Sequence, residues 1–175
     1  MKWLLLIPAV FLLVIVGMFV LGLLQPVKHS VTRSIRLKEK PEIVFAAVDN
    51  FDDLPNWSTN VLKVERLPNR DGKSAARVTM KWGDMQMVMA QLERTPPTRL
   101  VVGAAKEGGE TLGTWTYELT GENGGCRVSL TEEGELKNPF YRAIGRIRGL
   151  DANITQTLRD LAKKFGETAD VPAGR

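Results

Sequence analysis

Residues 138–166, NPFYRAIGRIRGLDANITQTLRDLAKKFG, decide the fold predicted for this chain. Asn138 and Pro139 suit a helix start, because Asn caps free backbone N–H groups and Pro fits the first turn. Gly166 suits a helix end. Apolar side chains recur between them every three or four residues, the spacing of one helix face; they are Phe140, Ile144, Ile147, Leu150, Ile154, Leu158, Leu161 and Phe165. The pattern therefore predicts one continuous helix from Asn138 to Phe165.

The sequence N-terminal to this helix predicts a series of strands separated by turn residues. Runs that alternate apolar and polar side chains are bounded by Gly, Pro, Asn and Asp, as is typical of strands and tight turns. The predicted strands are His29–Leu37, Val61–Leu67, Ser74–Trp82, Met85–Leu92, Arg99–Ala104, Thr111–Leu119 and Arg127–Leu136. From Val61 onward the links are too short for parallel crossovers, so these strands should form an antiparallel meander.

Two short helices are expected between the first strand and the second. Pro41 and Glu42 suit a first helical turn, and Asn50 suits its end. A second short helix or turn is expected over Asp52–Asn60, where Pro55 interrupts the chain. One strand, two short helices, a run of strands and one long helix predict an α+β domain, in which a curved antiparallel sheet wraps around the C-terminal helix.

An uncharged apolar segment precedes this domain. The 22 residues from Trp3 to Leu24 contain no Lys, Arg, Asp or Glu. At about 1.5 Å per residue a helix of this length reaches about 33 Å, enough to cross a hydrocarbon core of about 30 Å. The sequence therefore predicts a single-pass transmembrane anchor over residues 1–27, a domain over 28–166 and a flexible tail over 167–175.

The alternative for this segment is a cleaved signal peptide. Signal peptides have an apolar stretch of about 7–15 residues and end at small residues. Here the stretch is longer and ends in Leu-Gly-Leu-Leu-Gln-Pro at residues 21–26, which favours an uncleaved anchor. Lys28, Arg33, Arg36, Lys38 and Lys40 follow it, and by the positive-inside rule they place the domain in the cytoplasm.

The composition narrows the function classes. The net charge of +4 is mild, which argues against a nucleic-acid-binding protein. The single cysteine, Cys126, excludes an intramolecular disulfide, and the single histidine, His29, has no nearby ligand partner for a metal ion. No phosphate-binding or dinucleotide-binding glycine motif occurs, so no cofactor is expected.

Several segments carry a resemblance to a known family. They are Pro41–Phe45 (PEIVF), Phe51–Ser58 (FDDLPNWS), Gly113–Leu119 (GTWTYEL), Gly125–Val128 (GCRV) and Asn138–Pro139. With their order, they make the region from Lys28 to Phe165 resemble the START-like SRPBCC superfamily of polyketide cyclases and lipid carriers, and more narrowly its membrane-anchored bacterial members. The resemblance implies a helix-grip fold with a cavity for a lipid or another apolar molecule between the sheet and the long helix. It does not settle chemistry, because one fold carries many functions.

Large apolar and adaptable side chains are the candidates for lining that cavity. Pockets for small molecules are mostly apolar, with a few polar groups. The candidates are Phe45, Trp57, Met80, Trp82, Trp115, Tyr117, Glu132, Phe140 and Ile144. The competing interpretation is that these side chains fill an ordinary core, which would leave an interaction protein without a cavity.

Polar residues leave an enzymatic alternative open. Glu132 shares a strand face with Val128 and Leu130, so it becomes a buried carboxylate if that face points inward. Together with Tyr117 it is the best candidate for acid–base chemistry of the cyclase or aromatase kind, although no catalytic motif is present. Arg142, Arg146 and Arg148 would contact anionic headgroups or an acidic ligand, or form a solvated helix face. The predicted function is a membrane-anchored carrier of apolar molecules.

Overall fold

A computed structural model describes residues 3–70, 72–81 and 85–171. The chain divides into two compact units. Unit 1 comprises residues up to His29 together with Glu135–Leu150, and unit 2 comprises Ser30–Gly134 together with the chain from Asp151 onward.

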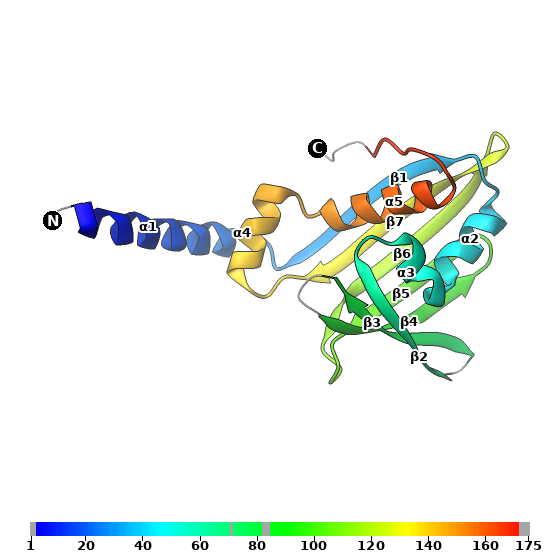
Figure 1. Ribbon diagram of the computed structural model, residues 1–175, viewed down its shortest axis with the longest axis horizontal. Coiled ribbons are helices and arrows are strands. Elements are labelled where there is room, and N and C mark those ends of the chain that lie inside the picture. Colours follow the sequence, from blue (N-terminus) through cyan, green and yellow to red (C-terminus); the bar gives the residue numbers. More distant parts are fainter. Residues whose placement is uncertain (1–2, 71, 82–84, 172–175) are drawn as a thin grey trace. The chain divides into compact units, whose positions relative to one another are not determined.

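A single sheet is the framework of unit 2 (Figure 1). The described residues form seven strands in the order β1-β7-β6-β5-β4-β3-β2. The bounds are β1 Lys28–Leu37, β2 Val61–Arg70, β3 Lys73–Met80, β4 Gln86–Thr95, β5 Arg99–Ala105, β6 Thr111–Glu122 and β7 Gly125–Glu135. Consecutive strands from β2 to β7 pair antiparallel. The predicted antiparallel sheet is confirmed.

The hairpin between β6 and β7 shows how local sequence sets the register. Its two-residue loop is Asn123-Gly124, and both residues have positive φ, 47° and 81°. Asn and Gly are the residues that adopt this conformation most readily in tight hairpin turns. The turn pairs Glu122 with Gly125, and through the ladder it pairs Trp115 with Glu132.

Two helical segments follow β1, as the sequence predicts. The α2 helix spans Pro41–Asp49, with Pro in its first turn and Val44, Phe45, Ala47 and Val48 buried. The short η1 (Phe51–Asp53) and α3 (Leu54–Trp57) follow, and bury Phe51, Leu54 and Trp57.

The predicted continuous helix over Asn138–Phe165 is wrong in one respect. The structure has two helices, α4 at Pro139–Arg148 and α5 at Ala152–Lys164. Gly149 separates them with a φ of 91°, a conformation that ends a right-handed helix and that only Gly adopts readily. The two helices also belong to different units, α4 to unit 1 and α5 to unit 2.

Unit 1 joins α4 to the N-terminal helix α1, which spans Trp3–Leu23 (Figure 1). The rings of Phe19 and Phe140 lie 5.7 Å apart. The buried Arg142 donates a hydrogen bond from Nε to the carbonyl oxygen of Gly22, at a distance of 2.8 Å. As predicted, Asn138 caps α4 by accepting from the N–H of Phe140.

The transmembrane part of the sequence prediction has no support in the structure. Among the residues that the structure describes, no helix combines the length and the apolarity needed to cross a membrane. The predicted span over residues 3–24 is therefore not found.

The segment after α5 has no regular secondary structure as far as Val171. Val171 is buried against the core of unit 2, and the Glu167 carboxylate accepts a hydrogen bond from the backbone N–H of Lys38. The last residues of the predicted tail, 172–175, lie outside the described part of the chain.

Candidate ligand-binding site

The inner face of strands β5, β6 and β7 in unit 2 is largely apolar. Alternation along β5, β6 and β7 turns every second side chain to this face. Its buried members are Leu100, Val102 and Ala104 from β5, Tyr117 and Leu119 from β6, and Cys126, Val128 and Leu130 from β7. Ile154, Leu158 and Leu161 of α5 belong to the same buried cluster. An apolar layer therefore lies between the sheet and α5.

A polar cluster interrupts this layer near the start of α5. The Glu132 carboxylate is half-buried and accepts two hydrogen bonds through Oε2, from Trp115 Nε1 at 2.9 Å and from Asn153 Nδ2 at 3.1 Å. Val128 and Leu130 on the same strand face are fully buried, so Glu132 points in the direction that the sequence argument required. We call Trp115, Tyr117, Glu132 and Asn153 the inner-face cluster.

Tyr117 adds a neutral phenol to this cluster. Burial raises its pKa far above the usual range, and the negative charge of Glu132 raises the pKa further. The hydroxyl therefore keeps its proton at any physiological pH. A phenol that keeps its proton near a carboxylate offers a bound molecule both a donor and an acceptor.

An open pocket of about 460 Å³ lies between α3 and α5. It is lined by Trp57, Ser58 and Thr59 at the end of α3, by Lys81, and by Asp160, Lys163 and Lys164 of α5. Its volume falls within the range of about 300–1,000 Å³ that is usual for small-molecule sites. We call it the α3–α5 pocket.

Asp160 fixes one wall of the α3–α5 pocket. Its carboxylate is only 3% exposed and accepts from the backbone N–H and the hydroxyl of Thr59, at 2.7 and 2.8 Å. Gln156 donates to its second oxygen at 2.9 Å. Next to Thr59, the side chain of Asn60 donates to Asn153 at 3.3 Å, so hydrogen bonds connect this wall to the inner-face cluster.

Trp57 carries an unused donor beside the same pocket. Its side chain is 9% exposed, and its Nε1 is buried without a hydrogen-bond partner among the described residues. A buried donor without an acceptor costs about 1–3 kcal/mol. An acceptor atom on a bound molecule would remove that cost.

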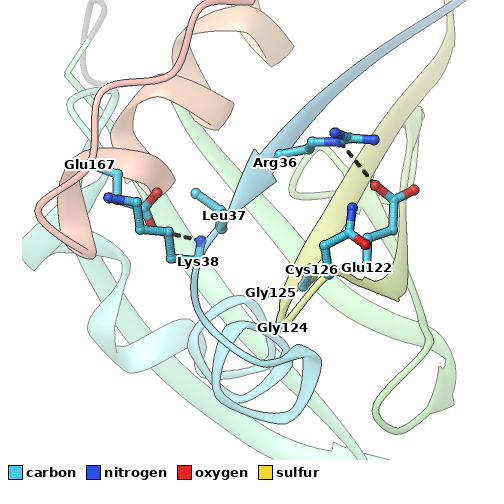
Figure 2. Close-up of a pocket in the computed structure, with 9 residues that line it drawn as sticks. Arg36, Leu37, Lys38, Glu122, Gly124, Gly125, Cys126 and Glu167 are labelled. Carbon is cyan, nitrogen blue, oxygen red and sulfur yellow. Dashed lines mark hydrogen bonds and ion pairs between the residues drawn. The ribbon is translucent and has the colours of Figure 1, made fainter.

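A further pocket, of about 350 Å³, lies where the end of β1 meets the β6–β7 hairpin (Figure 2). Its carboxylates are already paired. Glu122 forms ion pairs with Arg36 and Arg127, and hydrogen bonds from Arg127 are the main reason that the pKa of Glu122 is lowered. Burial raises the pKa of the Cys126 thiol to about 11, with smaller contributions from Glu42 and Glu122. At neutral pH this thiol is therefore protonated and a poor nucleophile.

The structure brings together most of the side chains predicted to line a cavity. Phe45, Trp57 and Tyr117 are buried in the core of unit 2, while Met80 and Trp115 pack against it. Glu132 joins them through Trp115. Whether these side chains line a cavity remains a prediction.

Two of the predicted residues, Phe140 and Ile144, are not part of this group, and the position of a third is not described. Trp82 lies outside the described residues. Phe140 and Ile144 belong to α4 of unit 1, where Phe140 packs on Phe19.

Sequence reasoning missed two residues of the site, Asn153 and Asp160. Both flank the apolar stripe of α5 and lie seven residues apart, which places them on the same side of the helix. Polar residues recurring at this spacing beside a buried stripe were the available signal. Among the described residues, no cluster of His, Cys, Asp and Glu could hold a metal ion.

Residues 28–166 match the model of the family described as polyketide cyclase/dehydrase and lipid transport. The chain belongs to this family. The match covers β1 to Gly166, so it includes the whole sheet, both C-terminal helices and the candidate site. The resemblance to the START-like SRPBCC superfamily, drawn from the sequence, is confirmed. No curated protein matches the chain in sequence.

Solved structures similar to this chain include several aromatase/cyclases. The di-domain aromatase/cyclase StfQ from the steffimycin biosynthetic pathway is 12% identical, with a TM-score of 0.64, over 80% of this chain and 52% of StfQ. This chain thus spans about half the length of that protein. The Zhui aromatase/cyclase from Streptomyces sp. R1128 is 9% identical, with a TM-score of 0.63, over 78% and 93% of the two chains. A protein from Thermus thermophilus is 18% identical, with a TM-score of 0.59, over 77% and 93%. At these identities the likeness establishes the fold.

Proposed function

We propose that unit 2 binds an apolar molecule that carries a polar group at one end. The observation that supports this most directly is the inner-face cluster, where a half-buried carboxylate and a protonated phenol interrupt an otherwise apolar layer. The family, which includes lipid-transport proteins, points in the same direction.

The α3–α5 pocket is the proposed entrance. It adjoins Trp57, whose Nε1 would donate to an oxygen of the entering molecule, and hydrogen bonds through Asn60 and Asn153 lead from its wall to Glu132. The apolar part of the ligand supplies most of the binding free energy, at about 25 cal/mol for each Å² of apolar surface removed from water. The polar cluster then orients the ligand.

Native mass spectrometry of the full chain, purified in mild detergent and exposed to a total membrane lipid extract, tests the proposal. We expect a stoichiometric bound apolar molecule in the wild type. Glu132→Gln should reduce its occupancy about tenfold, since a hydrogen bond to a charged group is worth about 1.5–3 kcal/mol. Glu133→Gln is the matched control, because Glu133 is the next residue of β7 and is exposed on the opposite face.

The outcomes separate the candidate functions. If the Glu132→Gln and Glu133→Gln variants bind the molecule with equal occupancy, Glu132 is not part of the binding site. Absence of any bound molecule in the wild type would overturn the carrier proposal and favour an interaction protein whose interior is filled by its own side chains.

A second candidate function is an enzyme of the aromatase or cyclase type. The observation that favours it is the proximity of the Glu132 carboxylate to the protonated Tyr117 phenol, an acceptor and a donor in one cluster. Such a pair would remove a proton beside a ketone and stabilise the developing enolate. Incubation with a poly-β-ketone thioester mimic should yield cyclised product, detected by mass spectrometry, and Glu132→Gln should lower the rate at least about a hundredfold. A rate unchanged by this substitution would exclude Glu132 as the base.

We also propose that α1 attaches the chain to a membrane. The helix has 21 residues and none of them is charged. Apolar side chains all around it are exposed, among them Ile7, Phe11 and Leu13. A helix that is apolar on every side needs either a protein core or a lipid environment around it.

Membrane fractionation tests this attachment. The full chain should sediment with membranes and resist alkaline carbonate extraction, whereas recovery in the carbonate supernatant would contradict insertion of α1. The basic residues after the apolar segment favour exposure of unit 2 on the cytoplasmic side. Protease treatment of sealed spheroplasts checks this, because a cytoplasmic unit 2 survives and an external one is cleaved.

A further inference from the structure

The α4 helix exposes apolar side chains beside unpaired positive charges. Phe140, Ile144 and Ile147 are spaced four and three residues apart, so they share one face of the helix. All three are exposed, as is the neighbouring Tyr141. In unit 2, the residues of α5 that continue the same stripe are fully buried. The apolar face of α4 therefore still needs a partner.

Two arginines flank this face. Arg146 and Arg148 lie about 100° to either side of Ile147 around the helix. Both are exposed, and neither forms a hydrogen bond or an ion pair with any residue that the structure describes. The helix contains no acidic residue. By contrast, Arg77, Arg94, Arg99 and Arg127 on the strands of unit 2 are each paired with a carboxylate.

Contacts within unit 1 fix α4 at the C-terminal end of α1. Phe140 packs on Phe19, and Arg142 donates to the carbonyl of Gly22 in the last turn of α1. If α1 enters a bilayer, its C-terminal end reaches the headgroup layer, and α4 lies at the same depth. An amphipathic helix with aromatic and aliphatic side chains on one face and arginines beside them is typical of elements that lie in this layer.

We propose that α4 lies in the headgroup layer and binds anionic phospholipid through Arg146 and Arg148, with Phe140, Ile144 and Ile147 turned toward the acyl chains. This inference rests on the proposed attachment of α1 to a membrane. It adds a preference for lipid charge that α1, which carries no charge, does not supply. Unit 2 would thereby be held at anionic membrane surfaces.

A competition between two vesicle types tests the inference. The full chain is released from detergent by dilution into an equal mixture of phosphatidylcholine vesicles and denser vesicles of phosphatidylcholine with phosphatidylglycerol, which flotation then separates. A basic residue near an anionic surface contributes about 1 kcal/mol, so two of them predict a preference of about 30-fold for the anionic vesicles. The double variant Arg146→Gln/Arg148→Gln should lose this preference, and high salt should weaken it in the wild type.

The matched control is Lys73→Gln/Arg159→Gln, which removes the same charge from exposed positions of unit 2 outside the α3–α5 pocket. It should keep the preference of the wild type.

Equal loss in both double variants would show a general charge effect and overturn the assignment to α4. Wild-type binding to both vesicle types without preference would also overturn it, while leaving the attachment of α1 intact. Wild-type binding to neither vesicle type would refute the attachment and, with it, the role of α4. Circular dichroism confirms that each variant is folded.

Discussion

The two C-terminal helices carry one continuous apolar pattern but meet different surroundings. Leu158 on α5 is 0% exposed, whereas Ile147 on α4 is 64% exposed. Within unit 2, α5 buries its stripe in a core shared with the sheet, and within unit 1 α4 packs Phe140 and Arg142 against the last turns of α1. The same side-chain chemistry therefore stabilises the fold in unit 2, and in unit 1 it is free to contact another molecule.

The largest expected effect contrasts Leu158→Ala with Ile147→Ala. Truncating the buried leucine removes its transfer free energy and leaves a cavity, so the free energy of unfolding should fall by about 2–5 kcal/mol. Truncating the exposed isoleucine should change it by less than about 0.5 kcal/mol. Urea unfolding of the full chain in mild detergent measures both. Equal losses would mean that α4 is buried in a core as α5 is.

The next contrast concerns Asp160→Ala and Asp53→Ala, both in unit 2. Asp160 is buried, and its carboxylate accepts two hydrogen bonds from Thr59 and one from Gln156, so losing these bonds to a charged group should cost about 2–3 kcal/mol. Asp53 forms a surface ion pair with Lys164 at 2.5 Å, a kind of pair worth about 0–1 kcal/mol. Thermal unfolding gives both values. If Asp53→Ala proves the more harmful variant, Asp160 does not fix the wall of the α3–α5 pocket.

A third pair of substitutions examines unit 1. A Cβ at Gly22 would overlap the carbonyl oxygen of Pro139, so Gly22→Ala should push α4 from α1 at a cost of about 1–3 kcal/mol. Gly17 has open space around it, and Gly17→Ala gains the same helix propensity without the clash. Hydrogen exchange of the α4 amides should accelerate in the first variant alone. Unchanged exchange in both would show that the close approach of Gly22 and Pro139 does not hold α4.

The difference between the two helices also explains what the sequence could predict. Strand positions follow from alternation and turn residues, and the predicted strands begin and end within about three residues of those observed. The break at Gly149 was missed because the apolar spacing continues through it. The available signal was local, a Gly followed two residues later by Asp151, which flanks the start of α5. Periodicity reports which face of a helix is apolar, and it does not report what that face contacts.

In the candidate site, too, some residues could be identified from the sequence and others could not. Glu132 was identifiable because strand alternation ties it to Val128 and Leu130. Asn60 and Asn153 meet only in the folded chain, since 93 residues separate them, and no local pattern encodes that contact. Phe140 and Ile144 satisfied the apolar criterion, but that criterion alone does not distinguish a cavity wall from a surface that binds another partner.

The smallest expected effect is a loss of stability at high pH that arises from the Cys126 thiol. Its size shows how well the interior of unit 2 excludes water. Burial raises the pKa of its thiol from 9.0 to about 11. Because the folded state holds the proton more tightly than the unfolded state, stability is retained below about pH 9 and lost as the pH rises toward 11. At about pH 10 this should cost about 1 kcal/mol relative to neutral pH.

Cys126→Ala lacks the titrating thiol, so its stability should decline less than that of the wild type over the same interval. Urea unfolding of both proteins at each pH gives the difference. Parallel curves would mean that the thiol reaches water in the folded state, and that the core of unit 2 at the β6–β7 hairpin is as open as the surface of α4.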